Sequence, residues 1–173
     1  MSTIQKVNLE PVTDVLPLHR RDFPLADPTL ADPSNASVLI DGEWVTLNSS
    51  YQILRAASIG AAGNAASVRS FPIWSERGRT DIQAMSGRKM TTIFLGQYEM
   101  DTRVFDAAAV VNGGLAITTV LQPLKVASIT IGSRIYTGLV GTQYSSSDPI
   151  VGYVTKLPAN NGGKLRFMFG YRS

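Results

Sequence analysis

Few residues in this chain have side chains that could do chemistry. The single histidine, His19, lies in the cluster His19-Arg20-Arg21-Asp22, and there is no cysteine. Disulfides, thiolate metal sites and cysteine nucleophiles are therefore excluded, as is any mechanism that needs two imidazoles. A catalytic histidine also needs partners held rigidly beside it. Because Pro17 and Pro24 flank this cluster, we interpret it as a surface segment for ion pairing or docking.

Two acidic clusters have the residue types of a hydrolase or a metal site. Residues 76–81, Glu-Arg-Gly-Arg-Thr-Asp, combine two carboxylates with two arginines that could clamp a phosphate. Glu99, Asp101 and Asp106 offer oxygen ligands, but their segment lacks the glycine of a calcium loop and contains Arg103. We interpret the first cluster as a polar loop whose charges pair locally or with a neighbouring subunit, and the second as solvated strand ends. The sequence predicts no enzyme, no metal and no cofactor.

The last apolar run alternates strictly between two kinds of side chain. Leu165, Phe167, Phe169 and Tyr171 fall on one face of a strand, and Lys164, Arg166, Met168, Gly170 and Arg172 fall on the other. Exposed aromatics beside basic residues could stack on single-stranded nucleic acid. After a glycine-rich turn at the end of a chain, such a pattern is more typical of a core strand. We therefore expect a buried aromatic face and a basic outer face.

Charge is low and unevenly distributed. Charged residues make up 17% of the chain, against about 25% in a typical soluble domain. Residues 107–173 hold six basic residues and one acidic residue, Asp148, although the whole chain carries a net charge of only +3. The basic residues are scattered and form no stripe, so we expect no direct binding of nucleic acid. They indicate an ordinary basic surface, or a face complementary to an acidic protein.

The first 36 residues contain five of the nine prolines, at positions 11, 17, 24, 28 and 33. Proline at this density opposes both helices and central strands, so the sequence predicts an extended arm over residues 1–36. Apolar residues recur along it, which suits an arm lying on another surface, with a free tail as the alternative. The residues expected to bind a partner are Leu18, Arg20, Arg21, Phe23, Leu25 and Leu30.

Beyond the arm, short apolar runs rich in β-branched and aromatic residues recur between turn-forming residues. The expected strands are residues 37–40, 43–47, 52–57, 90–95, 103–105, 115–121, 126–131, 135–140, 150–155 and 165–171. Asp41-Gly42 predicts a hairpin between the first two, and residues 71–88 are expected to be irregular. This spacing predicts a mainly β domain over residues 37–173, an antiparallel barrel or jelly-roll-like sandwich that folds without the arm.

The sequence gives no sign of export or of a membrane span. Polar residues follow Met1, and no apolar run of the secretory type is present near it. The charge-free segment at residues 107–124 is interrupted by Asn112-Gly113-Gly114, so we expect a strand, a turn and a second strand there. The expected place of synthesis is a cytoplasm.

Residues 69–171 show a progression of strands and turns that is similar to one known family. GRTDIQA at 78–84 leads through TTIFL at 91–95 to YEMDTRVFD at 98–106, and NGGLAI at 112–117, IVGYV at 150–154 and LRFMFGY at 165–171 follow. This progression resembles the small β-rich decoration (cement) proteins on the heads of tailed bacteriophages. It contains no chemical motif, and residues 1–36 fall outside it.

The resemblance implies a non-enzymatic virion protein that binds the outer surface of the assembled capsid. Such a protein stabilises the capsid by bridging neighbouring major capsid subunits. Its implied partners are the major capsid protein and further copies of itself, as a homodimer or homotrimer, and its implied location is the capsid exterior. A β-rich tail or baseplate component is the first alternative, and a single-stranded nucleic-acid-binding β-barrel is the second.

Overall fold

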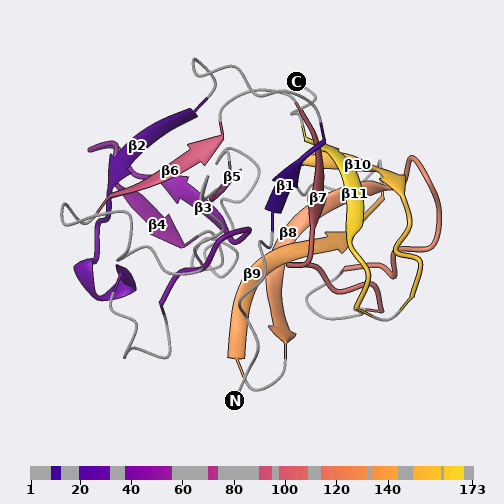
Figure 1. Ribbon diagram of the computed structural model, residues 1–173. Helices are drawn as coiled ribbons and strands as arrows, with labels where there is room; N and C mark the ends of the chain where they lie inside the picture. Colours follow the sequence, from indigo (N-terminus) through magenta and orange to yellow (C-terminus); the bar gives the residue numbers. More distant parts are fainter. Residues whose placement is uncertain are drawn as a thin grey trace.

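Turn-forming residues and prolines divide the chain into short runs, and these runs pair as antiparallel strands in the computed structural model (Figure 1). The structure describes residues 9–12, 20–31, 38–55, 70–73, 90–94, 98–108, 114–131, 134–143, 150–160 and 162–169, and the statements below concern these residues. The prediction of a mainly antiparallel β fold is confirmed.

The largest sheet has six strands that curl into a half barrel. In spatial order they are β1 (Leu9–Pro11), β7 (Tyr98–Thr102), β11 (Leu165–Phe169), β10 (Gly152–Lys156), β8 (Pro123–Ile131) and β9 (Arg134–Gly141). Every pair in this order is antiparallel. β8 and β9 form a long hairpin whose tip extends beyond the rest of the sheet (Figure 1). The edge strands of the sheet are β1 and β9.

Two smaller sheets lie beside the half barrel. The three-stranded sheet has the order β4 (Ile53–Arg55), β3 (Trp44–Leu47) and β5 (Ser70–Pro72), and the two-stranded sheet pairs β2 (Arg20–Pro24) with β6 (Met90–Phe94). The described residues contain one short 3₁₀ helix, η2 (Pro28–Ala31). No described helix is long and apolar enough to cross a membrane.

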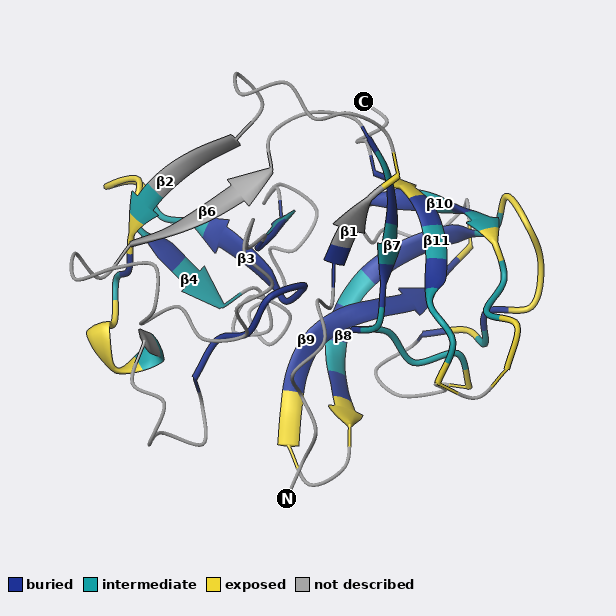
Figure 2. Ribbon diagram, in the orientation of Figure 1, coloured by how far each residue is buried: buried dark blue, intermediate teal, exposed yellow. Residues whose placement is uncertain are grey.

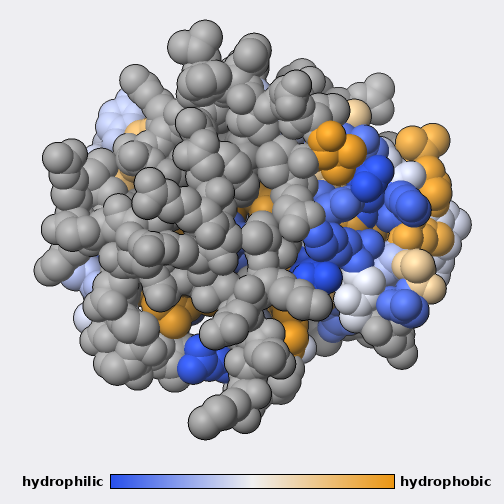
Figure 3. Space-filling view, viewed as in Figure 1, coloured by the Kyte–Doolittle hydropathy of each residue, from blue (hydrophilic) through white to orange (hydrophobic). Residues whose placement is uncertain are grey.

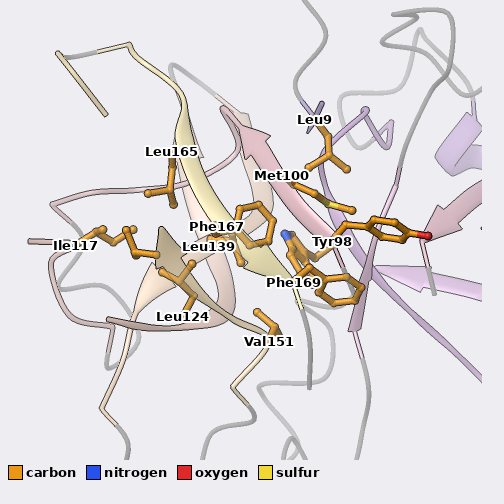
Figure 4. Close-up of a cluster of buried hydrophobic side chains, with 12 residues drawn as sticks. Leu9, Tyr98, Met100, Ile117, Leu124, Leu139, Val151, Leu165, Phe167 and Phe169 are labelled. Carbon is orange, nitrogen blue, oxygen red and sulfur yellow. The ribbon is translucent and has the colours of Figure 1, made fainter. Parts of the chain in front are cut away.

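The main core fills the inside of the half barrel (Figure 4). β7 and β11 each alternate buried and more exposed residues, so that Phe167 and Phe169 face inward, as the sequence predicts. Trp44 packs against both, with ring centroids 6.1 Å from Phe167 and 5.4 Å from Phe169. Because Trp44 belongs to β3, this contact joins the three-stranded sheet to the half barrel.

A second core cluster lies under the smaller sheets and includes residues assigned to the arm. Leu25 is 5% exposed and packs with Leu39, Val45, Ile53 and Ile73, and Phe23 and Leu30 pack against the same cluster. Leu9 is fully buried in the main core.

The described residues 9–12 and 20–31, which belong to the expected arm, therefore supply strands and buried side chains to the same cores as the domain expected at 37–173. The prolines are compatible with strands here because Pro11 and Pro24 are each the last residue of a strand. β1 lies at a sheet edge, and β2 belongs to a two-stranded sheet. At such positions a missing N–H leaves no ladder bond unmade.

Several expected strands differ from the observed ones. Only Leu115, bridged to Gly141, represents the strand expected at 115–121, and only Phe105, bridged to Leu139, represents the one expected at 103–105. Residues 38–40 form no strand, because the Ile40 N–H donates to the side chain of Glu43 instead of to a ladder. β5 lies in a region that was expected to be irregular.

Candidate functional site

A tight turn at residues 40–43 places two carboxylates in the interior. The Glu43 N–H donates to the Ile40 carbonyl over 3.2 Å, and Gly42 has φ of 87°, which glycine adopts without steric cost. The predicted turn at Asp41-Gly42 is therefore present, but β3 pairs with β4 and β5 and not with residues 38–40. The side chains of Asp41 and Glu43, hereafter the carboxylate pair, are 2% and 0% exposed.

The carboxylate pair binds both edge strands of the half barrel. The Leu9 N–H of β1 donates to Asp41 Oδ2 over 3.2 Å, and the Thr137 N–H of β9 donates to Glu43 Oε1 over 3.0 Å. Both amides belong to sheet edges, where backbone groups lack a neighbouring strand. One turn therefore spans the gap between the two edges and satisfies an amide on each. Figure 2 shows this buried segment in dark blue beside β9.

Glu43 is the more heavily bonded of the two acids. Its Oε2 accepts from the Ile40 N–H over 2.9 Å and from Arg55 Nη2 over 3.3 Å, and its Oε1 lies 3.3 Å from Arg55 Nε. Burial raises the pKa of Glu43, while Arg55 and the amides of Thr137 and Ile40 oppose that rise. Both carboxylate oxygens are occupied by donors from the chain itself. The arrangement is suited to holding three segments together.

The carboxylate pair was not identified from the sequence, where Asp41 appears only as a turn residue. A signal was nevertheless present, because these two acids interrupt an otherwise apolar run from Val38 to Val45. Carboxylates are rarely buried without partners. Two acids embedded in apolar residues therefore indicate amides or a cation nearby, although they do not say which.

Among the six residues predicted to bind a partner, the structure describes the side chains of Phe23, Leu25 and Leu30. Leu25 is buried in the second core cluster, and Phe23 and Leu30 are partly buried and pack against it. Arg20 and Arg21 belong to β2, opposite Phe94 and Ile93 of β6. Leu18 lies outside the described residues.

Two acids of the cluster at Glu99, Asp101 and Asp106 are bonded within the chain. Asp101 makes a two-bond ion pair with Arg166, at 2.7 Å and 3.0 Å, and Asp106 Oδ1 accepts from the Ala108 N–H. Within the part of the chain that the structure describes, no group of acids or histidines has the arrangement of a metal site. His19 and residues 76–81 lie outside that part.

A more prominent surface feature is the loop at residues 115–122, hereafter the end loop, which closes one end of the half barrel. It starts at the bridge between Leu115 and Gly141 and ends where Gln122 bonds to Val154 of β10. Ile117 is 7% exposed and points into the main core (Figure 4). The end loop is therefore anchored at both ends and in its middle.

The side chain of Gln122 holds the end loop in shape. Its Oε1 accepts from the N–H groups of Thr118 and Thr119 over 2.9 Å and 3.4 Å, and its Nε2 donates to the Ala116 carbonyl over 2.7 Å. Beyond these bonds, Val120 and Leu121 are 53% and 65% exposed. Leu121 has φ of 67°, a left-handed conformation that is uncommon for residues other than glycine.

We predict that Gly141→Ala destabilises the protein through the end loop. A methyl group at position 141 would lie 2.4 Å from Gln122 Nε2 and 2.6 Å from the Leu115 carbonyl oxygen. Leu115 cannot move away without breaking its two backbone bonds to Gly141. Overpacking of this kind typically costs about 1–3 kcal/mol, which urea unfolding measures. Gly163→Ala, whose new methyl group would lie 3.1 Å from its nearest neighbour, is the milder comparison. Equal stability of the two variants would contradict the prediction.

No known protein family, curated protein or solved structure matches this chain.

Proposed function

We propose that this chain is a non-enzymatic virion protein that decorates the outer surface of the capsid of a tailed bacteriophage and bridges neighbouring major capsid subunits. The observation that carries the proposal is a set of large apolar side chains exposed on short loops and strand ends. They are Val12, Tyr51, Leu115, Val120 and Leu121, each between 38% and 69% exposed. Neighbouring exposed apolar side chains, such as Val120 and Leu121, are suited to contact with other proteins.

The hydrogen bonds made by the two edge strands of the half barrel support the same proposal. Unprotected edge strands invite pairing with any other exposed strand. Here carboxylates bind amides on both edges of the half barrel, and Leu115 and Val104 bond to further backbone groups of β9. A protein whose edge-strand amides are already bonded can be present at high density on a capsid without uncontrolled pairing of its strands with those of its neighbours. Contact with the capsid would then be made by side chains and not by the backbone groups of edge strands.

Stabilisation would follow from mass action. A ligand that binds only the assembled shell raises the free energy needed to break it, by about 2.7 kcal/mol at a free concentration one hundred times Kd. No bond needs to be made or broken. The proposed partners are the major capsid protein and further copies of this chain, in a homodimer or homotrimer, and the proposed location is the capsid exterior.

Fractionation of native particles tests the proposal. Heads and tails are separated, and each fraction is probed with an antibody to this chain. We expect the protein in many copies on heads and none on isolated tails. We also expect heads stripped of it to release DNA at a lower temperature than intact heads.

Other distributions would point to the alternative functions. Recovery on tails alone would replace the proposal with a tail or baseplate role. Binding to single-stranded DNA with an affinity that falls steeply with salt would replace it with a nucleic-acid-binding role.

A further inference from the structure

We infer that the end loop is a docking surface for an acidic protein face that carries an apolar pocket, with Leu121 as the anchor and Lys156 as the flanking charge. The inference rests on the proposed function, because it names the part of this chain that would meet the shell.

Leu121 combines two features that folding alone does not favour. A left-handed backbone costs an L-residue with a side chain roughly 1–2 kcal/mol relative to the right-handed one. Burial of the side chain could offset such a cost, but Leu121 is 65% exposed. Glycine or asparagine would satisfy this backbone at a lower cost. An exposed leucine held in this conformation therefore indicates a contact outside the chain.

The surroundings of Leu121 make it a rigid projection. The Leu121 N–H donates to the Val154 carbonyl over 2.7 Å, and the Val154 N–H donates to the Gln122 carbonyl over 3.0 Å. With the side-chain bonds of Gln122, these contacts fix the loop on both sides of its exposed residues. An anchor that is already ordered loses little conformational entropy on binding.

The charge at this end of the sheet defines the partner. Lys156 is exposed and ends β10, two residues after Val154. Lys156 of β10 pairs in register with Arg166 of β11, and Arg166 makes an ion pair with Asp101. Figure 3 shows apolar and polar surface side by side on the right-hand side of this view, where β10 and β11 lie. An apolar tip flanked by an exposed lysine is complementary to an acidic surface with an apolar recess.

A protein fits this chemistry better than a nucleic acid does. Single-stranded nucleic acid is bound by exposed aromatic rings above a groove of cations. The aromatic rings of β11, Phe167 and Phe169, are 0% and 2% exposed, and the projecting residues of the end loop are aliphatic. Aliphatic anchors fit the apolar recesses of protein surfaces.

The test compares two equally exposed residues for binding to heads freed of this protein. Leu121→Asn removes the apolar anchor and keeps a residue that tolerates a left-handed backbone. The matched control is Ile135→Thr, since Ile135 is also 65% exposed. Ile135 pairs with Thr130, near the far end of β8, a strand that spans about 27 Å by strand geometry. Each variant and the wild type are sedimented with the heads at a series of concentrations, and urea unfolding is measured in parallel.

We expect Leu121→Asn to raise the Kd for heads at least about tenfold, a loss typical of an interface anchor, without lowering the urea midpoint. Ile135→Thr should change Kd less than about twofold, as is usual outside the anchor of an interface. Lys156→Glu should slow association, and the effect should shrink as salt is added.

The possible failures are distinguishable. If the wild type binds heads and Leu121→Asn binds equally well, this inference is wrong and the proposed function stands. If the wild type does not bind heads, both are wrong. Retention of the wild type on single-stranded DNA, abolished by Leu121→Asn, would assign the end loop to nucleic acid instead.

Discussion

Glu43→Gln is expected to lower the free energy of unfolding by about 2–4 kcal/mol, because it leaves a buried amide without an acceptor and removes an ion pair. Glutamine is nearly the same size as glutamate, so no cavity complicates the result. The substituted side chain has one acceptor oxygen, whereas Glu43 accepts from the N–H groups of both Ile40 and Thr137. In either orientation the new NH₂ group faces a donor. Urea unfolding followed by circular dichroism gives the difference.

The matched control for this variant is Glu99→Gln. Glu99 lies on β7 and is only partly buried. Its replacement should change stability by less than about 1 kcal/mol, as is usual for surface charges. If both variants lose the same amount, the carboxylate pair does not hold the sheet edges. Arg55→Met should weaken the protein less than Glu43→Gln does, since the backbone amides keep their acceptor.

The parts of the fold that the sequence predicted are those decided by local pattern. β11 alternates apolar and polar residues, and β6, β8, β9 and β10 are β-branched runs next to turn-forming residues, so these strands could be placed within a few positions. The turn at Asp41-Gly42 was predicted because glycine at a positive φ is a local requirement. No distant residue is needed for either inference.

The rest of the fold depends on contacts between residues far apart in the chain. Asp41 bonds to Leu9, 32 residues away, and Glu43 bonds to Thr137, 94 residues away. No local pattern contains those partners. Pro11 and Pro24 argued against strands, yet each ends a strand where no further ladder bond is required. The sequence alone cannot tell an edge strand from an arm.

The residues singled out in the sequence differ from those of the candidate site in the structure for the same reason. Phe23 and Leu25 looked available for a partner because the sequence does not show Ile53 and Val45, which they contact through the second core cluster. Leu121 looked like part of a strand because it ends the run at residues 115–121, which is rich in β-branched residues. Its left-handed φ, set by the bonds of Gln122, takes it out of the sheet and into solvent.

Deletion of residues 1–31 is expected to prevent folding, which is the opposite of what an independent arm would give. The deletion removes Leu9 from the main core and Leu25 from the second cluster, together with β1 and β2. Each buried leucine is worth about 2–5 kcal/mol when truncated to alanine. Their sum approaches the stability of a whole domain, about 5–15 kcal/mol. The truncated chain should be insoluble or give a non-cooperative urea transition.

Point variants separate the loss of core packing from the loss of chain length. Leu9→Ala, at a fully buried position, should lower the free energy of unfolding by about 2–5 kcal/mol. Val12→Ala, just beyond β1 and 38% exposed, should cost less than about 1 kcal/mol. Leu9 matters twice, because its side chain fills the core and its N–H donates to Asp41. A soluble, cooperatively folding chain without residues 1–31, or equal effects of Leu9→Ala and Val12→Ala, would restore the view that this segment is an arm.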